Sequence, residues 1–472
     1  MNVLLRDVEV EGRRSDVLLA GGRVAAIGAG LPAPVGAEVV AGGGGALLPG
    51  LHDHHLHLLS MAAALDSVDC GPGAVRSPEA LAEALRRAPG GPGGWVRGTG
   101  YHEDVAGPLD RHLLDRLVPD RPVRVQHRSG ALWMVNSRGL GEVAHVLDQS
   151  PDVERDAHGR PTGRLWRYDA RLRPALADAP PDLARVGSAL AAYGITGVTD
   201  ATPDLDPATV HLLGRAVADG ALPQRVVLLG APTGTELPPG LTAGPRKLLL
   251  RDHDLPPYDE LAAVIADEHA AGRPVAVHCV TRDSLLLTLT VLDEVGPLPG
   301  DRVEHAAVVP EGIAEWMARL GVRVVTQPDF LRTRGGTYRR EVDPDDLPHL
   351  YPYAGLLGAG VPTCASSDAP FGVADPWQVI ASAIDRTTAD GDILGAGERV
   401  PPATALAGYL CAHDEPGGTP RRVFPGAPAD LVLLRTPLDQ ALAEPDAGAV
   451  AAVWRCGRRL DTTGPGIAGH RP

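Results

Sequence analysis

Short apolar stretches of strand character alternate with amphipathic stretches of helical character over residues 51–370. This alternation is typical of βαβ units, in which the strands run parallel and each helix covers the sheet. Helical periodicity, with apolar residues three and four apart, is clearest in residues 258–271 and 284–295. The strands are expected at residues 51–57, 194–201, 224–229, 246–250, 274–279, 302–306, 323–328 and 362–368. Eight parallel strands with right-handed crossovers close into a barrel, so we expect an α/β fold with a (β/α)8 TIM barrel.

The two ends of the chain have a different, all-β pattern. Residues 2–28 contain short β-type runs with a Gly21-Gly22 turn between the last two, which predicts a hairpin. Residues 430–434 and 449–458 predict further strands near the other end. Because chain termini often lie close together, we expect both ends to form one small β-sandwich domain.

These patterns divide the 472 residues into two expected domains. The small β-sandwich domain takes residues 1–48 and 400–472, and the TIM-barrel domain takes residues 49–399. The segment between the first two expected strands, residues 58–181, is rich in Gly, Pro and Arg and is far too long for one crossover. We therefore expect it to be an insertion on the barrel.

Charge and cysteine usage narrow the class of protein. The formal net charge of −15 disfavours nucleic acid and anionic membranes as partners, because both require clustered basic surface. No apolar run reaches the roughly 18 residues of a membrane-spanning helix. The five cysteines lie far apart without a CxxC spacing, which indicates neither a zinc knuckle nor a disulfide framework. We expect a cytoplasmic enzyme acting on a small molecule, with a homodimer as a candidate assembly.

The strongest local motif is Pro-Gly-Leu-His-Asp-His-His-Leu-His, which ends at His57. Alternate side chains of a strand point the same way, so His55 and His57 would both face the barrel axis and could share one metal ion. Imidazole nitrogens at this spacing suit zinc and similar ions. An isolated His-x-His is more often a histidine-rich loop, so the position of this one on the first expected strand carries the argument.

Four further residues of metal-ligand type lie at the ends of later expected strands: Lys247, His278, His305 and Asp368. Catalytic residues of a TIM barrel come from the C-terminal ends of its strands. Each residue alone has an ordinary explanation, since such a histidine is more often a hydrogen-bonded core residue and a Ser-Asp pair is usually a helix N-cap. Together, and in register with the strands, they predict a metal site.

With these motifs in place, the chain resembles the amidohydrolase superfamily, and within it the branch of N-substituted formamide deformylases and YtcJ-like proteins. The histidine motif resembles the metal motif of the first strand in that branch. Other segments resemble the same branch and lie at residues 95–101, 135–137, 194–201, 303–306, 327–328 and 366–370. The resemblance covers nearly the whole chain and implies a hydrolase that cleaves a C–N bond in an amide, formamide or cyclic amide.

The resemblance also implies a set of metal ligands for two divalent ions, with Zn2+ as the expected species. His55 and His57 would hold the more buried ion, and His278 and His305 the more exposed one. A carboxylated Lys247 and a hydroxide would bridge the ions. Asp368 would contact a metal, take a proton from the attacking water and pass it to the leaving nitrogen.

Lys247 is the only lysine of the chain, while arginine fills every other basic position among the 44 Lys and Arg residues. An ammonium group has no lone pair with which to bind a cation, but the carbamate formed with carbon dioxide has two oxygens. Arginine cannot form that carbamate. The ordinary alternative is a chance lysine that makes a salt bridge.

The substrate is less well defined, because the chain departs from the family pattern where substrate would be held. A histidine is expected in place of Ala131, a glutamate in place of Arg167, and an Asp-Gly with a longer loop after Lys247. By position, the candidate substrate-binding residues are Tyr101, His102, Arg128, Asn136, Arg167, Phe330 and Phe371. The arginines among them would suit an anionic substrate group, although solvated surface arginines are equally common.

Two other functions remain open at the level of sequence. A mononuclear deaminase of the same superfamily would use the same histidines and Asp368, but it usually has a glutamate soon after the fifth-strand histidine. Here Cys279-Val280-Thr281-Arg282 follows His278, which favours the two-metal hydrolase. A non-catalytic scaffold related to hydantoinases is the other alternative, and such chains typically lose ligands that this chain keeps.

Overall fold

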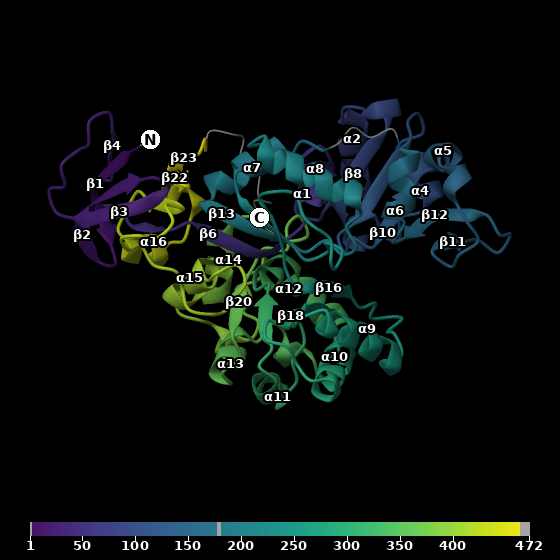
Figure 1. Ribbon diagram of the computed structural model, residues 1–472. Coiled ribbons are helices and arrows are strands. Elements are labelled where there is room, and N and C mark those ends of the chain that lie inside the picture. The colour runs from purple at the N-terminus through teal and green to yellow at the C-terminus, as the bar shows by residue number, and fades with distance from the viewer. Residues whose placement is uncertain (1, 177–180, 463–472) are drawn as a thin grey trace. The chain divides into compact units, whose positions relative to one another are not determined.

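The computed structural model describes residues 2–176 and 181–462, and the chain divides into two compact units (Figure 1). Unit 1 contains the described residues up to Leu58 and from Leu183 onward, and unit 2 lies within Leu59–Asp182. Among the described residues, no helix is both long and apolar enough to cross a bilayer. Each unit has its own sheets and its own hydrophobic clusters.

Parallel strands form the centre of unit 1. Each of the eight expected strands contains one of them: β6 (Leu51–Leu56), β13 (Ile195–Asp200), β14 (Arg225–Leu228), β16 (Arg246–Leu249), β17 (Val275–Cys279), β18 (Arg302–His305), β19 (Arg323–Thr326) and β20 (Thr363–Ala365). They belong to two parallel sheets, with strand orders β15-β14-β13-β6 and β16-β17-β18-β19-β20. The strand β15 (Leu241–Ala243) is an addition that the sequence pattern did not predict.

Backbone contacts extend beyond both sheets. The amide of Lys247 on β16 donates to the carbonyl of Leu229, just after β14, at 3.0 Å. At the other side, the amide of Asp368 donates to the carbonyl of His55, and the amide of His57 donates to the carbonyl of Ala369, each at 2.8 Å. The end of β6 therefore lies directly beside the segment that follows β20.

The helices of unit 1 pack their apolar faces on these strands. Ile265, Leu289 and Met317 from three helices join the cluster that contains Val277 and Val303 of the sheet. The helix from Arg282 begins with a capping box, in which Thr281 and Ser284 bond each other's backbone amides. The helices are α7 (Leu183–Ala192), α8 (Pro207–Ala218), α9 (Tyr258–Ala270), α10 (Arg282–Val295), α11 (Ile313–Leu320), α12 (Asp329–Glu341), α13 (Tyr353–Gly358), α14 (Pro376–Asp385), α15 (Pro402–Leu410) and α16 (Leu438–Ala443), with short 3-10 turns at Leu347–His349, Ala396–Glu398 and Ala447–Ala449.

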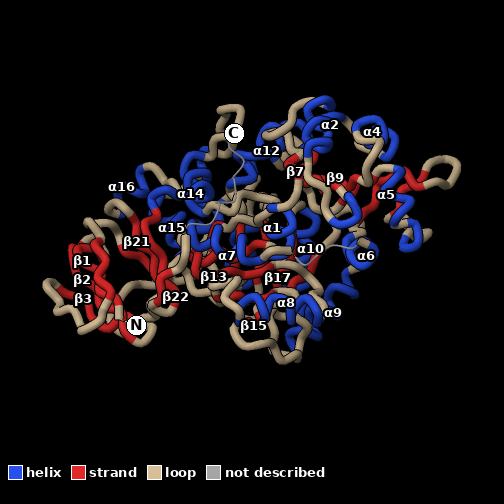
Figure 2. Tube along the Cα trace, turned by 90° about the horizontal axis from the view of Figure 1, so that it is seen from above, coloured by secondary structure: helices blue, strands red, loops and turns tan. Residues whose placement is uncertain are grey.

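The terminal segments add two small sheets to unit 1. One has the order β3-β2-β1-β4 and the other β23-β22-β21-β5. Figure 2 shows β1, β2 and β3 side by side. Gly21 and Gly22 have φ values of 58° and 76°, as the predicted tight hairpin turn requires. Val3 and Leu5 share a hydrophobic cluster with Leu431 and Trp454. The strands are β1 (Val3–Val10), β2 (Arg13–Ala20), β3 (Arg23–Gly28), β4 (Glu38–Ala41), β5 (Leu47–Pro49), β21 (Leu431–Leu434), β22 (Val450–Arg455) and β23 (Arg458–Arg459).

Unit 2 is built on a six-stranded mixed sheet with the order β11-β12-β10-β9-β8-β7. One cluster joins Val96 and Val125 to Leu81 and Leu114 of two helices, and a second contains Trp133. The strands are β7 (Val68–Asp69), β8 (Val96–Tyr101), β9 (Val123–His127), β10 (Leu132–Val135), β11 (Val153–Arg155) and β12 (Pro161–Trp166). The helices are α1 (Leu58–Leu65), α2 (Pro78–Arg87), α3 (Glu103–Ala106), α4 (Arg111–Leu117), α5 (Ser137–Glu142) and α6 (Asp169–Ala175), with 3-10 turns at Pro92–Gly94 and Ala144–Val146.

Candidate metal centre and active site

His55 and His57 lie on and just after β6, where strand alternation turns both rings to one side. Their ring centroids are 5.5 Å apart. His55 is buried, with 1% of its surface exposed. Burial, with a contribution from the nearby charge of Lys247, holds the pKa of His55 well below its usual value. Its ring is therefore neutral near pH 7, which is the form that can bind a metal ion.

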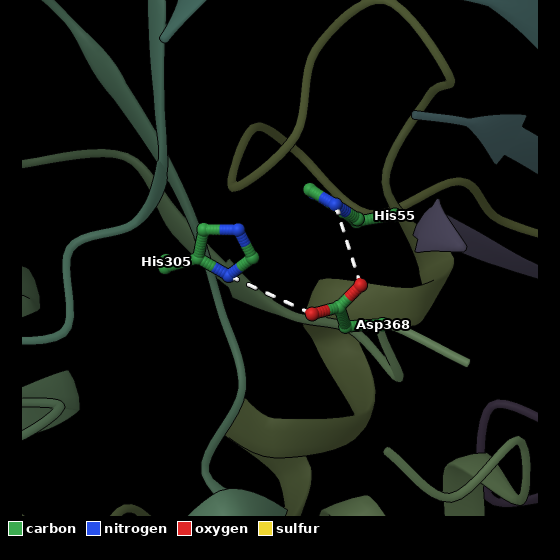
Figure 3. Close-up of side chains that lie close together, drawn as sticks. All are labelled: His55, His305 and Asp368. Carbon is green, nitrogen blue, oxygen red and sulfur yellow. Dashed lines mark ion pairs between the residues drawn. The ribbon is translucent and has the colours of Figure 1, made fainter. Parts of the chain in front are cut away.

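Asp368 brings its carboxylate to these histidines and to His305. One oxygen, Oδ1, lies 3.3 Å from Nε2 of His57 and 3.6 Å from Nε2 of His55, and Oδ2 lies 3.9 Å from Nδ1 of His305. Figure 3 shows the side chains of His55, His305 and Asp368 pointing toward one another. One ligand-type atom from each of these three residues lies within 4.8 Å of the others. This is the spacing of a set that can share a cation.

His278 and Lys247 complete the set predicted from sequence. The rings of His278 on β17 and His305 on β18 are 4.5 Å apart. Lys247 on β16 is buried, and its Nζ has no hydrogen-bond partner among the residues that the structure describes. Burial lowers the pKa of Lys247, and the carboxylates of Glu304 and Asp368 partly oppose that shift. A larger fraction of Lys247 is therefore in the neutral amine form, which carbamate formation requires, than for a lysine on the protein surface.

The backbone reaches this arrangement through two unusual residues. Asp368 lies three residues beyond the end of β20, rather than on the strand as expected. It has a φ of 52°, and His305 at the end of β18 has a φ of 72°. Such left-handed conformations are costly for residues with a side chain and tend to persist at functional sites.

Three neighbouring side chains orient the histidines, and the sequence reasoning assigned no role to any of them. Nδ1 of His55 bonds the carboxylate of Glu304, which is fully buried. Nδ1 of His305 lies 2.7 Å from Oε1 of Gln327, and Nδ1 of His57 lies 3.1 Å from Oγ1 of Thr202. In His55 and His57, a partner on Nδ1 leaves Nε2 to face Asp368 and a bound cation, which is how metal-binding histidines are usually held.

Glu304 is itself held by Arg302, whose Nε lies 2.5 Å from Oε1 of the carboxylate. Both side chains are almost completely buried. Neighbouring residues of a regular strand point to opposite faces, which would separate Glu304 from His305. The left-handed backbone at His305 breaks that alternation, so both side chains reach the site. The signal in the sequence was the place of Glu304 directly before the candidate ligand His305, within the segment 303–306 that resembles the amidohydrolase branch.

The donor set fits a divalent cation. It combines imidazoles that burial keeps neutral, one carboxylate and a buried amine without a partner among the described residues. Nitrogen and oxygen donors of this kind suit zinc and similar ions. Oδ1 of Asp368 also makes no hydrogen bond within the described part of the chain. A bound cation would satisfy both orphaned groups.

A family model described as the amidohydrolase family matches residues 38–460. The chain belongs to the amidohydrolase family. It is 28% identical to N-substituted formamide deformylase of Arthrobacter pascens, over 91% of each chain. It is 26% identical to a protein of Bacillus subtilis (strain 168) that is named as the amidohydrolase YtcJ, over 79% of this chain and 80% of that one. This amidohydrolase is therefore a hydrolase of C–N bonds other than peptide bonds.

Solved structures with similar folds are also hydrolases. An uncharacterized metal-dependent hydrolase from Pyrococcus horikoshii OT3 has a TM-score of 0.73 at 20% identity, covering 98% of this chain and 100% of that one. N-isopropylammelide isopropylaminohydrolase from Burkholderia multivorans ATCC 17616 has a TM-score of 0.52 at 18% identity, covering 97% and 98%. At these identities the likeness supports the α/β fold of this amidohydrolase.

Two of the candidate substrate-binding residues of this amidohydrolase lie in unit 1, near the histidines. The ring of Phe371 packs edge-on against His57 at 5.3 Å. Phe330 is buried, and the guanidinium of Arg334 lies 3.8 Å from its ring centroid. Arg334 also donates to the carbonyl of Phe371 at 2.6 Å. The ring of Phe371 thus lies beside His57, and the positive charge of Arg334 lies next to both phenylalanines.

The other candidates lie in unit 2. Tyr101 is buried there, and its hydroxyl donates to the carbonyl of Gly107 at 2.5 Å. Asn136 caps α5, since its Oδ1 accepts from the amides of Val123 and Gly139. The contacts of Tyr101 and Asn136 are those of fold-forming residues. A substrate role for them, and for His102, Arg128 and Arg167, stays a prediction.

Proposed function

We propose that this amidohydrolase cleaves an amide, formamide or cyclic amide C–N bond at a centre for two divalent ions, with Zn2+ as the species that the donors favour. The observation that carries the proposal is the buried cluster of His55, His305 and Asp368, together with the buried amine of Lys247, which has no hydrogen-bond partner among the described residues. A deformylase among the relatives supports a small N-acyl or N-formyl substrate.

The proposed scaffold is a closed (β/α)8 barrel of residues 49–399. The eight parallel strands support it, as do the backbone bonds that join β16 to the end of β14 and β6 to the segment after β20. Residues 58–181 would be an insertion after the first barrel strand. The shared cluster of Leu5 and Trp454 supports one small β-sandwich domain from residues 1–48 and 400–472.

We assign the ligands as follows. His55 and His57 would hold one ion, because both lie within 3.6 Å of the same Asp368 oxygen. His278 and His305, whose rings are in edge contact, would hold the other. Lys247 would bridge them as a carbamate, in which the Nζ lone pair forms a bond to the carbon of carbon dioxide and Nζ releases a proton. The carbamate has two oxygens for two ions.

When bound, the ions would lower the pKa of water and polarise the scissile carbonyl. Asp368 is placed to accept the proton of the attacking water and to return it to the leaving nitrogen, since its Oδ1 makes no hydrogen bond among the described residues. Glu304 and Gln327 hold His55 and His305 in orientation. Phe371 packs edge-on against His57 and would offer the substrate an apolar surface.

The test is to load the purified full chain with Zn2+, count the ions and screen N-acyl, N-formyl, cyclic amide and ester libraries. We expect about two ions per chain at this centre and turnover of one C–N class. Less than about half an ion per chain at this centre, with no turnover, would support a scaffold instead. A single ion at this centre with release of ammonia would support a mononuclear deaminase.

A further inference from the structure

A second group of histidine and carboxylate side chains lies within unit 2, in a segment that supplies no metal ligand to the proposed hydrolytic centre. His102 directly follows β8, Glu103 begins α3, and His127 ends β9. The strands β8 and β9 run parallel with Tyr101 opposite His127. The amide of Arg128 donates to the carbonyl of Tyr101 at 2.8 Å, which fixes the two strand ends side by side.

The three side chains converge on one point. Nε2 of His127 lies 3.1 Å from Oε2 of Glu103, and Nε2 of His102 lies 4.0 Å from the same oxygen. One ligand-type atom from each residue lies within 4.8 Å of the other two. His102 is buried, while Glu103 and His127 are partly exposed, so the group opens to solvent on one side.

We propose that His102, Glu103 and His127 bind a divalent transition-metal ion of the Zn2+ type, with a fourth position open to water. Two ligand atoms that share a tetrahedral Zn2+ at about 2.0–2.2 Å lie about 3.3–3.6 Å apart. The separations of 3.1 Å and 4.0 Å lie on either side of that value, so small shifts bring both imidazoles to a suitable distance from the Glu103 oxygen. Two imidazoles and one carboxylate are a donor set that zinc prefers.

The second ring nitrogen of each histidine has a partner suited to a metal ligand. Nδ1 of His102 lies 3.2 Å from Oδ2 of Asp104, and Nδ1 of His127 lies 2.8 Å from Oγ of Ser129. With an ion on Nε2, each Nδ1 carries the proton and donates it to that oxygen. Carboxylate and hydroxyl partners of this kind fix the tautomer and raise the basicity of metal-binding histidines.

Two features of the group compete with metal binding. The backbone amides of Asp104 and Ser129 also approach these Nδ1 atoms, at 3.3 Å and 3.1 Å, and would donate to them if no ion were bound. Arg128 adds a positive charge near His102. An ion pair between Glu103 and His127 alone would explain their contact but would not require His102 to face the same oxygen.

The experiment measures zinc per chain at a fixed free Zn2+ concentration in the full-length protein. We compare the wild type with His127→Gln and Glu103→Gln, which change partly exposed side chains. The control is His158→Ala, which removes an exposed histidine of unit 2 that belongs to neither ligand group. We expect the first two variants to bind about one ion fewer per chain than the wild type, and the control to bind the same number.

The same variants in a His55→Ala background separate this site from the hydrolytic centre. The ion that His127→Gln removes should still bind when His55 is absent, whatever becomes of the proposed function. Asp104→Asn should lower the affinity for that ion by roughly 10- to 100-fold, because the side chain that orients His102 is changed. Equal zinc counts in His127→Gln, Glu103→Gln and the wild type would overturn the proposal, provided that circular dichroism shows all three folded.

Discussion

The two histidine-rich groups of this protein differ in how the chain assembles them. The group in unit 1 gathers residues as far apart in sequence as His55 and Asp368, and His55, Lys247, His305 and Asp368 of this group are buried. The group in unit 2 comes from two adjacent strand ends between His102 and His127 and opens to solvent. Burial excludes competing water and lowers the pKa of His55 and of His305, which keeps these two rings neutral and suits the first group to catalysis. The second group places its ligand atoms at the ends of two paired strands, β8 and β9.

The strongest test of that contrast is Asp368→Asn. An amide cannot accept the proton of the attacking water, so turnover should fall by roughly 10²- to 10⁴-fold. Metal content should stay near that of the wild type, because the histidines and Lys247 remain. Steady-state kinetics and zinc analysis on the same preparation check both parts. Turnover close to that of the wild type would remove Asp368 from the role of base.

Lys247 tests whether the buried group depends on a modified side chain. Lys247→Arg and Lys247→Ala should each bind one ion fewer than the wild type. Their turnover should fall by at least roughly 10²-fold, since a bound ion stabilises the transition state by several kcal/mol. A short carboxylic acid should partly restore Lys247→Ala, which leaves space for it, but not Lys247→Arg. The mass of the intact native protein should show the carbamate in the wild type alone. Full metal loading of Lys247→Arg would contradict the bridging role.

Glu304→Gln tests whether an orienting carboxylate distinguishes the buried group. The neutral amide is a weaker acceptor for Nδ1 of His55, so zinc should bind roughly 10- to 100-fold more weakly. The buried Arg302 also loses its counter-charge, which should cost about 3–5 kcal/mol of folding free energy. Metal titration and thermal denaturation separate the two effects. Glu311→Gln, at an exposed glutamate, is the matched control and should change neither quantity.

The smallest expected effect is in the rate of metal loss. A chelator should remove the ion of unit 2 about ten times faster than the ions of unit 1. The reason is that Glu103 and His127 are partly exposed, whereas the buried carboxylate of Glu304 holds His55 in place. Stopped-flow release monitored with a zinc indicator should show a fast phase in the wild type that is absent in His127→Gln. A single phase in both proteins would remove this distinction.

Residues with a simple local pattern were predictable. Apolar runs located β14, β17 and β19 to within a few residues, because a buried parallel strand needs a continuous apolar stretch. Gly21-Gly22 located the hairpin because few residues adopt its backbone angles. The sheet of unit 2 was missed, since its short strands alternate with glycines and prolines that predict loops.

By itself, the sequence determined which residue types are available and where the strands end: His55 and His57 on one face, and His278, His305 and the single lysine on later strands. Only the tertiary structure decided which side chains meet. Glu304 joins His55 across 249 residues because the chain turns at His305, and His102 meets His127 because β8 and β9 pair in one register. Local pattern reflects the period of one element, whereas these contacts depend on how separate elements pack.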